Sequence, residues 1–485
     1  MLRKVRIALA SVFFVGITLL FLDFTGVLHL YLGWMAKLQL LPAVLSLNVA
    51  VVLFFVVVTL LVGRTYCSVV CPMGVMQDVF IWLGGRWKKN RFHYTKGWPW
   101  LRVAMLVVFV LLMVLGLNGL AILIAPYSAY GRIATNLFQP VYLWINNLCA
   151  YFAERAGSYA FYSVDVWVKS GVTLAVAAVT FVVVGFVSFR WGRVWCNSVC
   201  PVGTVLGFLS QFSLMKPRID TSKCNGCGKC ARNCKAQCIN PKEHTVDASR
   251  CVACFDCMEN CSQKAISFSR GKAVVKEEPV DGSRRKFVAA TATVGAAMAL
   301  QAQEKKVDGG LAAIIDKQLP ERQVPLKPFG AKSLKNFSNR CTGCQLCVSE
   351  CPQQVLRPSQ KLSTLLQPEM AFDKGYCPPD CTRCSEVCPA GAIQKIDTAQ
   401  KSAISIGHAV TVSQNCLLGQ GVECNACSRH CPAAAISVVS DASTGHSRVV
   451  VNESRCLGCG ACEYYCPVRP FSAIFVEGRE VHTAI

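Results

Sequence analysis

The first 190 residues contain four long stretches in which nearly every position is apolar. They run over residues 7–24, 40–62, 103–125 and 171–189. A helix of about 20 apolar residues crosses the hydrocarbon core of a bilayer, so each stretch predicts a membrane-spanning helix. Strongly polar side chains are rare in them, apart from Asp23 near the end of the first and Asn48 inside the second. We therefore expect residues 1–215 to form a four-helix membrane domain.

Lysine and arginine are distributed unevenly between the segments that join these stretches. Three of them precede the first stretch and seven lie in residues 63–102, whereas residues 25–39 contain one and residues 126–170 contain three. Because cytoplasmic loops carry the excess of basic residues, both ends of the four-helix unit are predicted to face the cytoplasm. Nothing resembling a signal-peptide cleavage site follows the first stretch, so we expect it to be retained.

A cysteine-containing motif occurs twice, each time directly after a stretch that runs inward. Residues 63–74 and 192–203 share the pattern Gly-Arg-x-aromatic-Cys-x-x-x-Cys-Pro-x-Gly. The motif places four thiols at the cytoplasmic membrane surface: Cys67, Cys71, Cys196 and Cys200. One interpretation is that they converge on a metal, a cluster or a redox partner. The other is that they are small buried residues that let helix ends pack.

The chain contains 30 cysteines, and most of them stand in tight runs that suit iron–sulfur clusters. Residues 216–275 carry two runs with the spacing of bacterial two-cluster ferredoxins, in which the fourth cysteine of each run ligates the other cluster. One predicted set is Cys224, Cys227, Cys230 and Cys261. The other is Cys251, Cys254, Cys257 and Cys234. Zinc sites generally use two separated Cys-x-x-Cys pairs, so a cluster is the better interpretation.

Four further runs lie in residues 336–485, and each ends in Cys-Pro. The first two are Cys341, Cys344, Cys347, Cys351 and Cys377, Cys381, Cys384, Cys388. The last two are Cys416, Cys424, Cys427, Cys431 and Cys456, Cys459, Cys462, Cys466. They predict four clusters in two lobes, which brings the expected total to six [4Fe–4S] clusters. The fourth cysteines could be exchanged between consecutive runs or in nested order, and the similar gaps leave both open.

Two cysteines fall outside these patterns. Cys149 and Cys238 are each expected to be small buried residues, with Cys238 also a candidate alternative ligand because it follows Cys234 by four positions. The fold class we expect is a membrane α-helical bundle, with four spans and a candidate fifth, joined to α+β ferredoxin-like [4Fe–4S] domains. The formal charge of +22 falls to roughly +10 if each of six ligated clusters carries about −2. No basic run with interleaved aromatic residues indicates nucleic-acid binding.

The segment between the two cysteine-rich parts resembles an export signal. Ser283-Arg284-Arg285-Lys286-Phe287 is similar to a twin-arginine motif, and a weakly apolar stretch follows it. We assign residues 280–305 to this signal or to a fifth hydrophobic segment, and residues 306–335 to a linker. A used signal would place residues 336–485 outside the cytoplasm, in the periplasm, and leave residues 216–275 inside. The expected location is the inner membrane of a bacterium, crossed several times.

Taken together, these motifs resemble a fusion of two components of periplasmic nitrate reductase systems. Residues 1–275, with four apolar stretches, the paired Cys-x-x-x-Cys-Pro motifs and two ferredoxin runs, resemble the NapH type. Residues 283–480, with the twin-arginine-like motif and four runs, resemble the NapG type. The resemblance implies a quinol dehydrogenase component of a respiratory chain. The first part also resembles membrane ferredoxins that assemble or maintain copper oxidases and nitrous oxide reductase.

The remaining sequence features favour electron transfer over substrate chemistry. The chain lacks Cys-x-x-Cys-His, the attachment motif of haem c, and a Gly-x-Gly-x-x-Gly fingerprint for NAD or FAD. The resulting hypothesis is a relay from membrane quinol through the clusters to an extracytoplasmic reductase or multihaem cytochrome. In this relay, Asp23 is a candidate acceptor of a proton from quinol. The alternative is a biogenesis, maintenance or sensing protein for a metalloenzyme, in which the Cys-x-x-x-Cys-Pro pairs are the working site.

Overall fold

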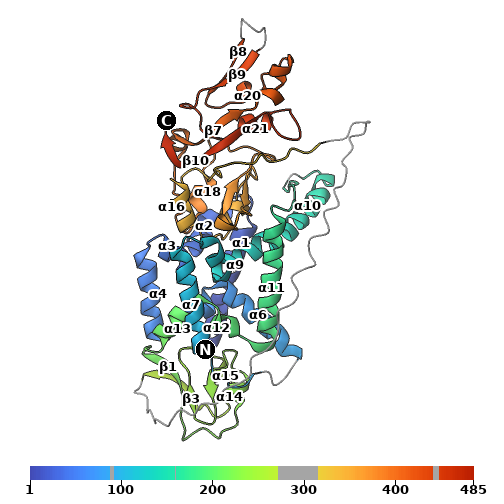
Figure 1. Cartoon of the computed structure of the whole chain (residues 1–485). Coiled ribbons are helices and arrows are strands. Elements are labelled where there is room, and N and C mark those ends of the chain that lie inside the picture. Colours follow the sequence, from blue (N-terminus) through green and yellow to red (C-terminus); the bar gives the residue numbers. More distant parts are fainter. Residues whose placement is uncertain (88–91, 159, 271–314, 441–446) are drawn as a thin grey trace, which may run out of the picture.

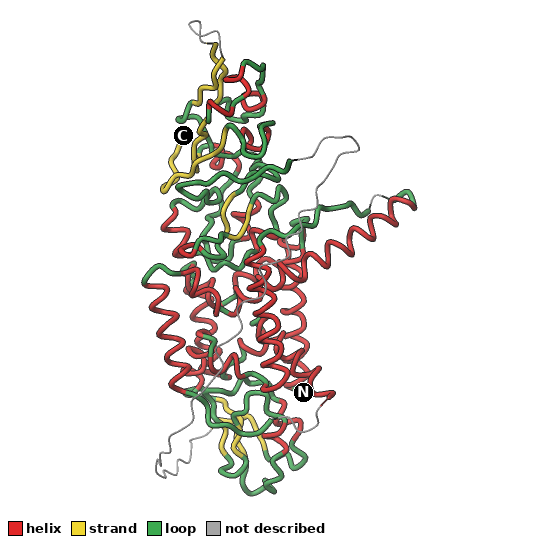
Figure 2. The backbone as a smooth tube through the Cα atoms, turned by 45° about the vertical axis from the view of Figure 1, so that its right-hand side comes forward, coloured by secondary structure: helices red, strands yellow, loops and turns green. Residues whose placement is uncertain are grey.

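A computed structural model describes residues 1–87, 92–158, 160–270, 315–440 and 447–485. These residues form an elongated molecule with a helical body in the middle and a cysteine-rich part at each end (Figures 1 and 2). Residues 215–270, the inner lobe, lie at the end of the body near the N-terminus. Residues 315–485, the outer lobes, lie at the opposite end. Residues 280–305, which carry the twin-arginine-like motif and the candidate fifth segment, lie outside the described residues, as does part of the linker.

The helical body is built from residues 2–210. Its first helices are α1 (Leu2–Leu22), α2 (Val27–Lys37), α3 (Leu40–Leu45), α4 (Val49–Val62), α5 (Tyr66–Val69), α6 (Pro72–Trp87) and α7 (Pro99–Val114). The others are α8 (Asn118–Ile124), α9 (Pro126–Ile133), the π-helix η1 (Ala134–Phe138), α10 (Gln139–Arg155), α11 (Gly171–Trp191), α12 (Val194–Ser198) and α13 (Pro201–Ser210). Helix α1 packs on α2 and α6, while α11 packs on α6 and α9.

The structure corrects the prediction of four full-length spans. Two of the four apolar stretches are each divided into two shorter helices. Within the described residues, α1 and α11 have 21 residues each and are long and apolar enough to cross a membrane. Residues 40–62 instead divide into α3 and α4, because Leu47 has a φ of 57° and the Asn48 side chain caps α4 by accepting from Val51 N. Residues 103–125 divide into α7 and α8 at Gly116, which has a φ of 75°. Helices α4 and α7 are apolar but have only 14 and 16 residues.

The inner lobe combines short helices with two small antiparallel sheets. Strand β1 (Met215–Ile219) pairs with β4 (Ile266–Arg270), so the first and last residues of the lobe lie side by side. Strand β2 (Ile239–Asn240) pairs with β3 (Thr245–Val246). Helices α14 (Lys229–Arg232) and α15 (Asp256–Asn260) each follow one cysteine loop. This arrangement confirms the predicted α+β class for residues 216–270.

The outer part contains two lobes of the same kind. The lobe next to the helical body has α16 (Leu334–Arg340), α17 (Leu346–Ser349), β5 (Leu356–Pro358), η2 (Leu362–Thr364), β6 (Pro368–Met370) and α18 (Arg383–Val387). The distal lobe has α19 (Thr398–Ser402), β7 (Ile404–Thr411), η3 (Ser413–Asn415), η4 (Leu417–Gln420), α20 (Ala426–Arg429), β8 (Ile436–Ser440), β9 (Ser447–Val451), α21 (Ala461–Tyr465) and β10 (Ile474–Ala484). In these lobes β5 pairs with β6, β7 with β10 and β8 with β9, all antiparallel.

Polar contacts fix both cysteine-rich parts to the helical body. At the inner end, Arg3 Nε lies 2.9 Å from Asp256 Oδ1. At the outer end, Asn118 Nδ2 donates to Ser338 O at 2.8 Å, and Asn136 Nδ2 donates to Gln345 Oε1 at 2.8 Å. The lobes are therefore docked directly on opposite ends of the body.

Candidate iron–sulfur and thiol sites

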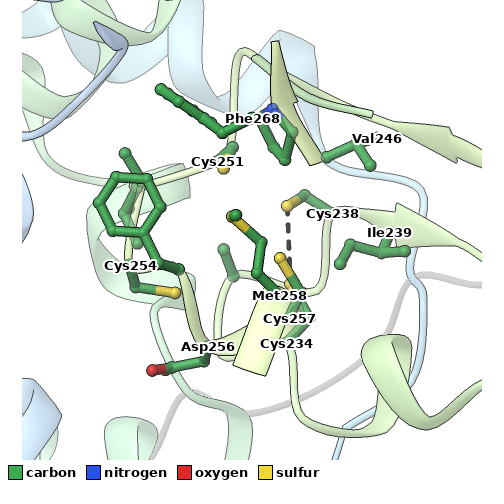
Figure 3. A pocket seen from close by; sticks show the side chains of 15 residues that line it. Cys234, Cys238, Ile239, Val246, Cys251, Cys254, Asp256, Cys257, Met258 and Phe268 are labelled. Carbon is green, nitrogen blue, oxygen red and sulfur yellow. Dashed lines mark hydrogen bonds between the residues drawn. The ribbon is translucent and has the colours of Figure 1, made fainter. Parts of the chain in front are cut away.

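Two cysteine-lined hollows occupy the inner lobe, with the grouping that the sequence predicts. Figure 3 shows the first, in which a complete loop and one distant cysteine face a common space: Cys251, Cys254, Cys257 and Cys234. The second hollow is lined by the other loop and its distant partner: Cys224, Cys227, Cys230 and Cys261. Each hollow thus receives three thiols from a tight loop and one from the far run, as a cubane cluster requires.

Cys238 is a fifth cysteine in the first hollow. It is buried, lines the same space and has its Sγ 3.6 Å from Cys234 Sγ. The expectation that Cys238 is buried is confirmed, and its position keeps it available as an alternative to Cys234. Cys149, in contrast, lies exposed on α10. The expectation that Cys149 is buried is wrong, because the surface of α10 that carries it is not covered by another element among the described residues.

The loops can wrap a cluster because particular residues adopt left-handed backbone conformations. Gly226 and Gly228 have positive φ values, and so do the equivalent Ala253 and Phe255. The same pair of positions recurs in the first and last outer runs. A left-handed residue on either side of the second cysteine turns the chain sharply, so that successive thiols face inward.

Backbone amides also point at the cysteine sulfurs. Ala265 N donates to Cys261 Sγ at 3.3 Å, and Ala435 N donates to Cys431 Sγ at the same distance. Ile393 N makes a similar contact of 3.5 Å with Cys388 Sγ. Hydrogen bonds of this kind stabilise negative charge on sulfur and tune the reduction potential of a bound cluster.

The outer lobes resolve the order in which the fourth cysteines are exchanged. One hollow is lined by Cys351 of the first run and three thiols of the second: Cys377, Cys381 and Cys384. Another is lined by Cys431 of the third run and three thiols of the fourth: Cys456, Cys459 and Cys462. Consecutive runs therefore pair, and the nested alternative does not describe the molecule.

A buried lysine accompanies the second outer run, whose first two cysteines are separated by three residues. Lys401 Nζ donates to Cys377 Sγ at 3.2 Å and to the carbonyl oxygens of Pro378 and Cys381 at 2.6 Å. Its side chain comes from α19, beyond the end of the run, so no spacing rule in the sequence indicates the contact. It places a positive charge directly on a candidate ligand.

The four cysteines of the repeated motif are all buried and lie close to one another. Burial and the neighbouring thiols raise the pKa of Cys71 and of Cys200. Two arginines join the repeats reciprocally: Arg64 Nη2 donates to Cys196 O at 3.2 Å, and Arg193 Nη1 donates to Cys67 O at 2.7 Å. The structure therefore brings together the thiols that the sequence singled out, next to buried positive charge.

Arg64 contributes a buried positive charge beside these thiols. Arg64 is fully buried and donates to Asn197 Oδ1 and Ser249 O, with its Nη2 3.9 Å from Cys67 Sγ. Among the described residues, its hydrogen bonds go to Asn197, Ser249 and Cys196 and not to a carboxylate. A buried guanidinium of this kind favours negative charge on adjacent sulfurs. Among the described residues, however, no group of three or more His, Cys, Asp or Glu side chains is spaced to hold a single metal ion.

Asp23 serves the turn between the first two helices. Its Oδ1 accepts from Thr25 N at 2.9 Å and from Thr25 Oγ1 at 2.6 Å, and its Oδ2 accepts from Leu28 N at 2.8 Å. These bonds join the end of α1 to the start of α2. They account for the burial of Asp23 without a role in proton transfer.

Comparisons with known proteins agree with the cysteine arrangement. A 4Fe-4S dicluster domain matches residues 340–392, which contain the first two outer runs, and residues 422–469, which contain the third run from Cys424 onward and all of the fourth. A second dicluster domain matches residues 247–355, and a 4Fe-4S binding domain matches residues 216–239. Another 4Fe-4S binding domain matches residues 47–90 and 172–220, which contain the repeated motif.

Several curated proteins are similar to parts of the chain. Ferredoxin-type protein NapG of Escherichia coli is 32% identical over 210 residues, which are 39% of this chain and 83% of that protein. Methylamine utilization ferredoxin-type protein MauM of Methylobacillus flagellatus is 31% identical over 32% of this chain and 69% of its own length. Putative electron transport protein YccM of E. coli is 24% identical over 41% of this chain and 48% of its own length. No solved structure matches the chain significantly.

Proposed function

Because this chain belongs to the NapG family of ferredoxin-type proteins, we propose that it relays electrons from membrane quinol to a reductase or multihaem cytochrome outside the cytoplasm. One observation carries the proposal: cysteine-lined hollows lie at both ends of an apolar helical body. An arrangement of this kind suits electron transfer on either side of a membrane.

The surface of the helical body supports placement in a bilayer. Large apolar side chains face outward along its length, among them Val12, Phe54, Val107 and Phe186, which are between 49% and 60% exposed. In water such a surface would be a liability, whereas in lipid it is the expected outer face. With α1 and α11 as full-length spans, the shorter α4 and α7 complete the bundle beside them.

The 24 cysteines of the six runs are the proposed ligands of six [4Fe–4S] clusters. The residues present fit such groups in three ways: three-plus-one thiol grouping, left-handed loops, and amide or ammonium donors aimed at sulfur. When bound, each cluster would accept and release one electron. The protein's own part is to space the clusters, shield them from water and adjust their potentials through these donors.

The four thiols of the repeated motif are proposed as an additional redox site beside the inner lobe. Arg64 connects them to that lobe through Ser249 O at 3.0 Å. This grouping also favours a second candidate function, in which the protein uses these thiols to maintain a metalloenzyme. Replacement of Cys67, Cys71, Cys196 and Cys200 by serine would then leave reduction of the clusters as it is in the wild type.

The test is an anaerobic titration of the detergent-purified protein with a menaquinol analogue, followed by EPR. About 24 iron atoms per chain and reduction of several clusters are expected for a quinol-fed relay. A full iron content without reduction by quinol, although dithionite reduces the clusters, would contradict the relay. That result would favour the maintenance function.

A further inference from the structure

A cavity that bears on the proposed function lies at the outer end of the helical body. It has a volume of about 500 Å³ and lies between η1 and α10, the segment before α11, and the first outer lobe. Its lining combines aromatic rings with a few polar groups, including Trp144, Tyr162, Trp167, Gln139 and Lys169. A cavity of this size and composition suits a planar organic molecule.

The polar groups of the cavity are held in place by the outer lobe. Lys169 Nζ donates to Gln139 Oε1 at 3.1 Å and to Val348 O at 3.3 Å. Gln139 Nε2 donates to Ser349 O at 3.3 Å. In the described part of the chain Lys169 has no ion pair with a carboxylate. An ammonium has three N–H donors, so one remains for a ligand oxygen.

One wall of the cavity is shared with a candidate cluster site. Cys351 lines the cavity and also lines the hollow that contains Cys377, Cys381 and Cys384. The cavity and that hollow also share Pro352, so only Cys351 and Pro352 are common to the linings of both. Such proximity suits a ligand that exchanges electrons.

The open side of the cavity adjoins an apolar helix surface. Along α10, Val141, Trp144, Ile145, Leu148 and Phe152 are between 53% and 67% exposed and recur with the period of one helix face. Figure 1 places α10 beside the outer end of α11. An apolar stripe with aromatic residues at this level is typical of a helix lying in the membrane interface. Trp144 belongs to both the stripe and the cavity lining, so a lipid-soluble ligand can reach the cavity from the bilayer.

We infer that this cavity binds the head group of an isoprenoid hydroquinone, with Lys169 and Gln139 holding one ring oxygen. The inference rests on the proposed function and adds the place of quinol oxidation. Each hydroquinone loses two electrons and two protons and becomes a quinone. The electrons would pass singly to the [4Fe–4S] clusters proposed on the Cys351 side, and the two protons would leave to water past Asp165, an exposed residue of the cavity lining.

The inference is tested with a 2-alkyl-4-hydroxyquinoline N-oxide, a fluorescent analogue whose binding is followed by quenching in the full-length, cluster-loaded protein. Lys169→Met removes the charged donor, and Val166→Trp fills the cavity from the segment before α11. We expect about tenfold or greater weakening for the first variant and loss of binding for the second. Lys374→Met changes an exposed lysine outside the cavity lining and should bind as the wild type does.

Iron content and reduction by dithionite show that each variant is folded and loaded. Unchanged analogue binding in both cavity variants, or none in the wild type, would overturn the inference. Reduction of the wild type by quinol would leave the proposed function standing in either case. Conversely, the variants could lose analogue binding while quinol fails to reduce the wild type. That result would support the binding site and refute the relay.

Discussion

Asp78 shows how single buried charges hold the inner lobe on the helical body. Its carboxylate lies 2.8 Å from Arg6 Nη1, 2.8 Å from Arg193 Nη2 and 3.1 Å from Lys235 Nζ. These cations come from α1, from the second repeated motif and from the inner lobe. Although burial disfavours its charge, the three cations hold the pKa of Asp78 well below its usual range. The stabilisation is therefore full at neutral pH and is lost as the pH falls below about 4, through the lowered pKa.

Replacement of Asp78 by Asn should leave Arg6 and Arg193 without an ion pair among the described residues, while Lys235 keeps Asp256 at 3.1 Å. We expect a loss of about 3–5 kcal/mol in the stability of the docked inner lobe, because removing one partner of a buried ion pair leaves charge uncompensated. Thermal unfolding in detergent measures it. Asp220→Asn is the control, since the Asp220 side chain is 41% exposed and its ion pair among the described residues is with the exposed Lys223. Equal midpoints for both variants would contradict this assignment.

The glycine that closes each repeated motif is required by close backbone packing. A Cβ on Gly74 would lie 2.2 Å from Cys67 O, and one on Gly203 would lie 2.3 Å from Cys196 O. The backbone cannot move away, because Arg193 and Arg64 hold these same carbonyl oxygens. The glycines thus let the turn that carries the first cysteine of each pair lie against the following helix.

Gly74→Ala and Gly203→Ala should each separate the paired cysteines. We expect faster alkylation of these thiols by iodoacetamide, detected by mass spectrometry of the native protein, because the buried site must open. Gly171→Ala is the matched control, since nothing lies within 4 Å of an added Cβ there. Thiols that stay as protected in the two motif variants as in the control would argue against the packing role.

At the scale of elements, the sequence predicted those features that depend on the local order of residues. Cysteine spacing was sufficient for the six runs and for the inner pairing, which the structure reproduces. The spacing could not order the outer runs, because their gaps are alike and only three-dimensional packing distinguishes the two orders. Apolar content likewise predicted where the helices lie, but it did not predict the breaks at Leu47 and Gly116. Each of these breaks depends on the left-handed backbone conformation of a single residue. Lys401 and the quinol cavity depend on contacts between distant segments, for which no local signal exists.

Lys401 allows a test of whether a residue outside a cysteine run changes the reduction potential of the cluster that the run binds. Its ammonium donates to Cys377 Sγ, so it should favour the reduced, more negative state of a cluster held there. Lys401→Met should lower that reduction potential by roughly 60 mV or more, the equivalent of a charged hydrogen bond of about 1.5 kcal/mol. An EPR-monitored redox titration measures it. Lys395→Met, an exposed change in the same lobe, should leave all potentials unchanged.

If every potential in Lys401→Met matched that of the wild type, Cys377 would not be a ligand in the way proposed. Loss of iron in the variant would instead show that the lysine is needed for assembly. Iron analysis before the titration therefore separates a tuning role from a structural one.

At the scale of the whole molecule, the arrangement of the lobes bears on the route that electrons would take in the proposed relay. The inner lobe and the four buried thiols lie together at one end of the helical body, while the outer lobes and the quinol cavity lie at the other. Quinol oxidised at the outer end would deliver electrons to the outer lobes without their crossing the bilayer. The inner lobe and the thiols then form a separate redox unit, which accounts for the presence of cysteine-lined hollows at both ends.

This division requires the inner and outer lobes to lie on opposite sides of a membrane. An epitope inserted between Lys242 and Glu243, in the turn between β2 and β3, should be hidden from antibody in intact spheroplasts and accessible after permeabilisation. An epitope after Ile485 should be accessible in both. Replacing Arg284 and Arg285 by Lys should keep the second epitope hidden if the twin-arginine-like motif directs export. Equal accessibility of the two epitopes would mean that the helical body does not span the membrane, and the lobes would then have to exchange electrons on one side of it.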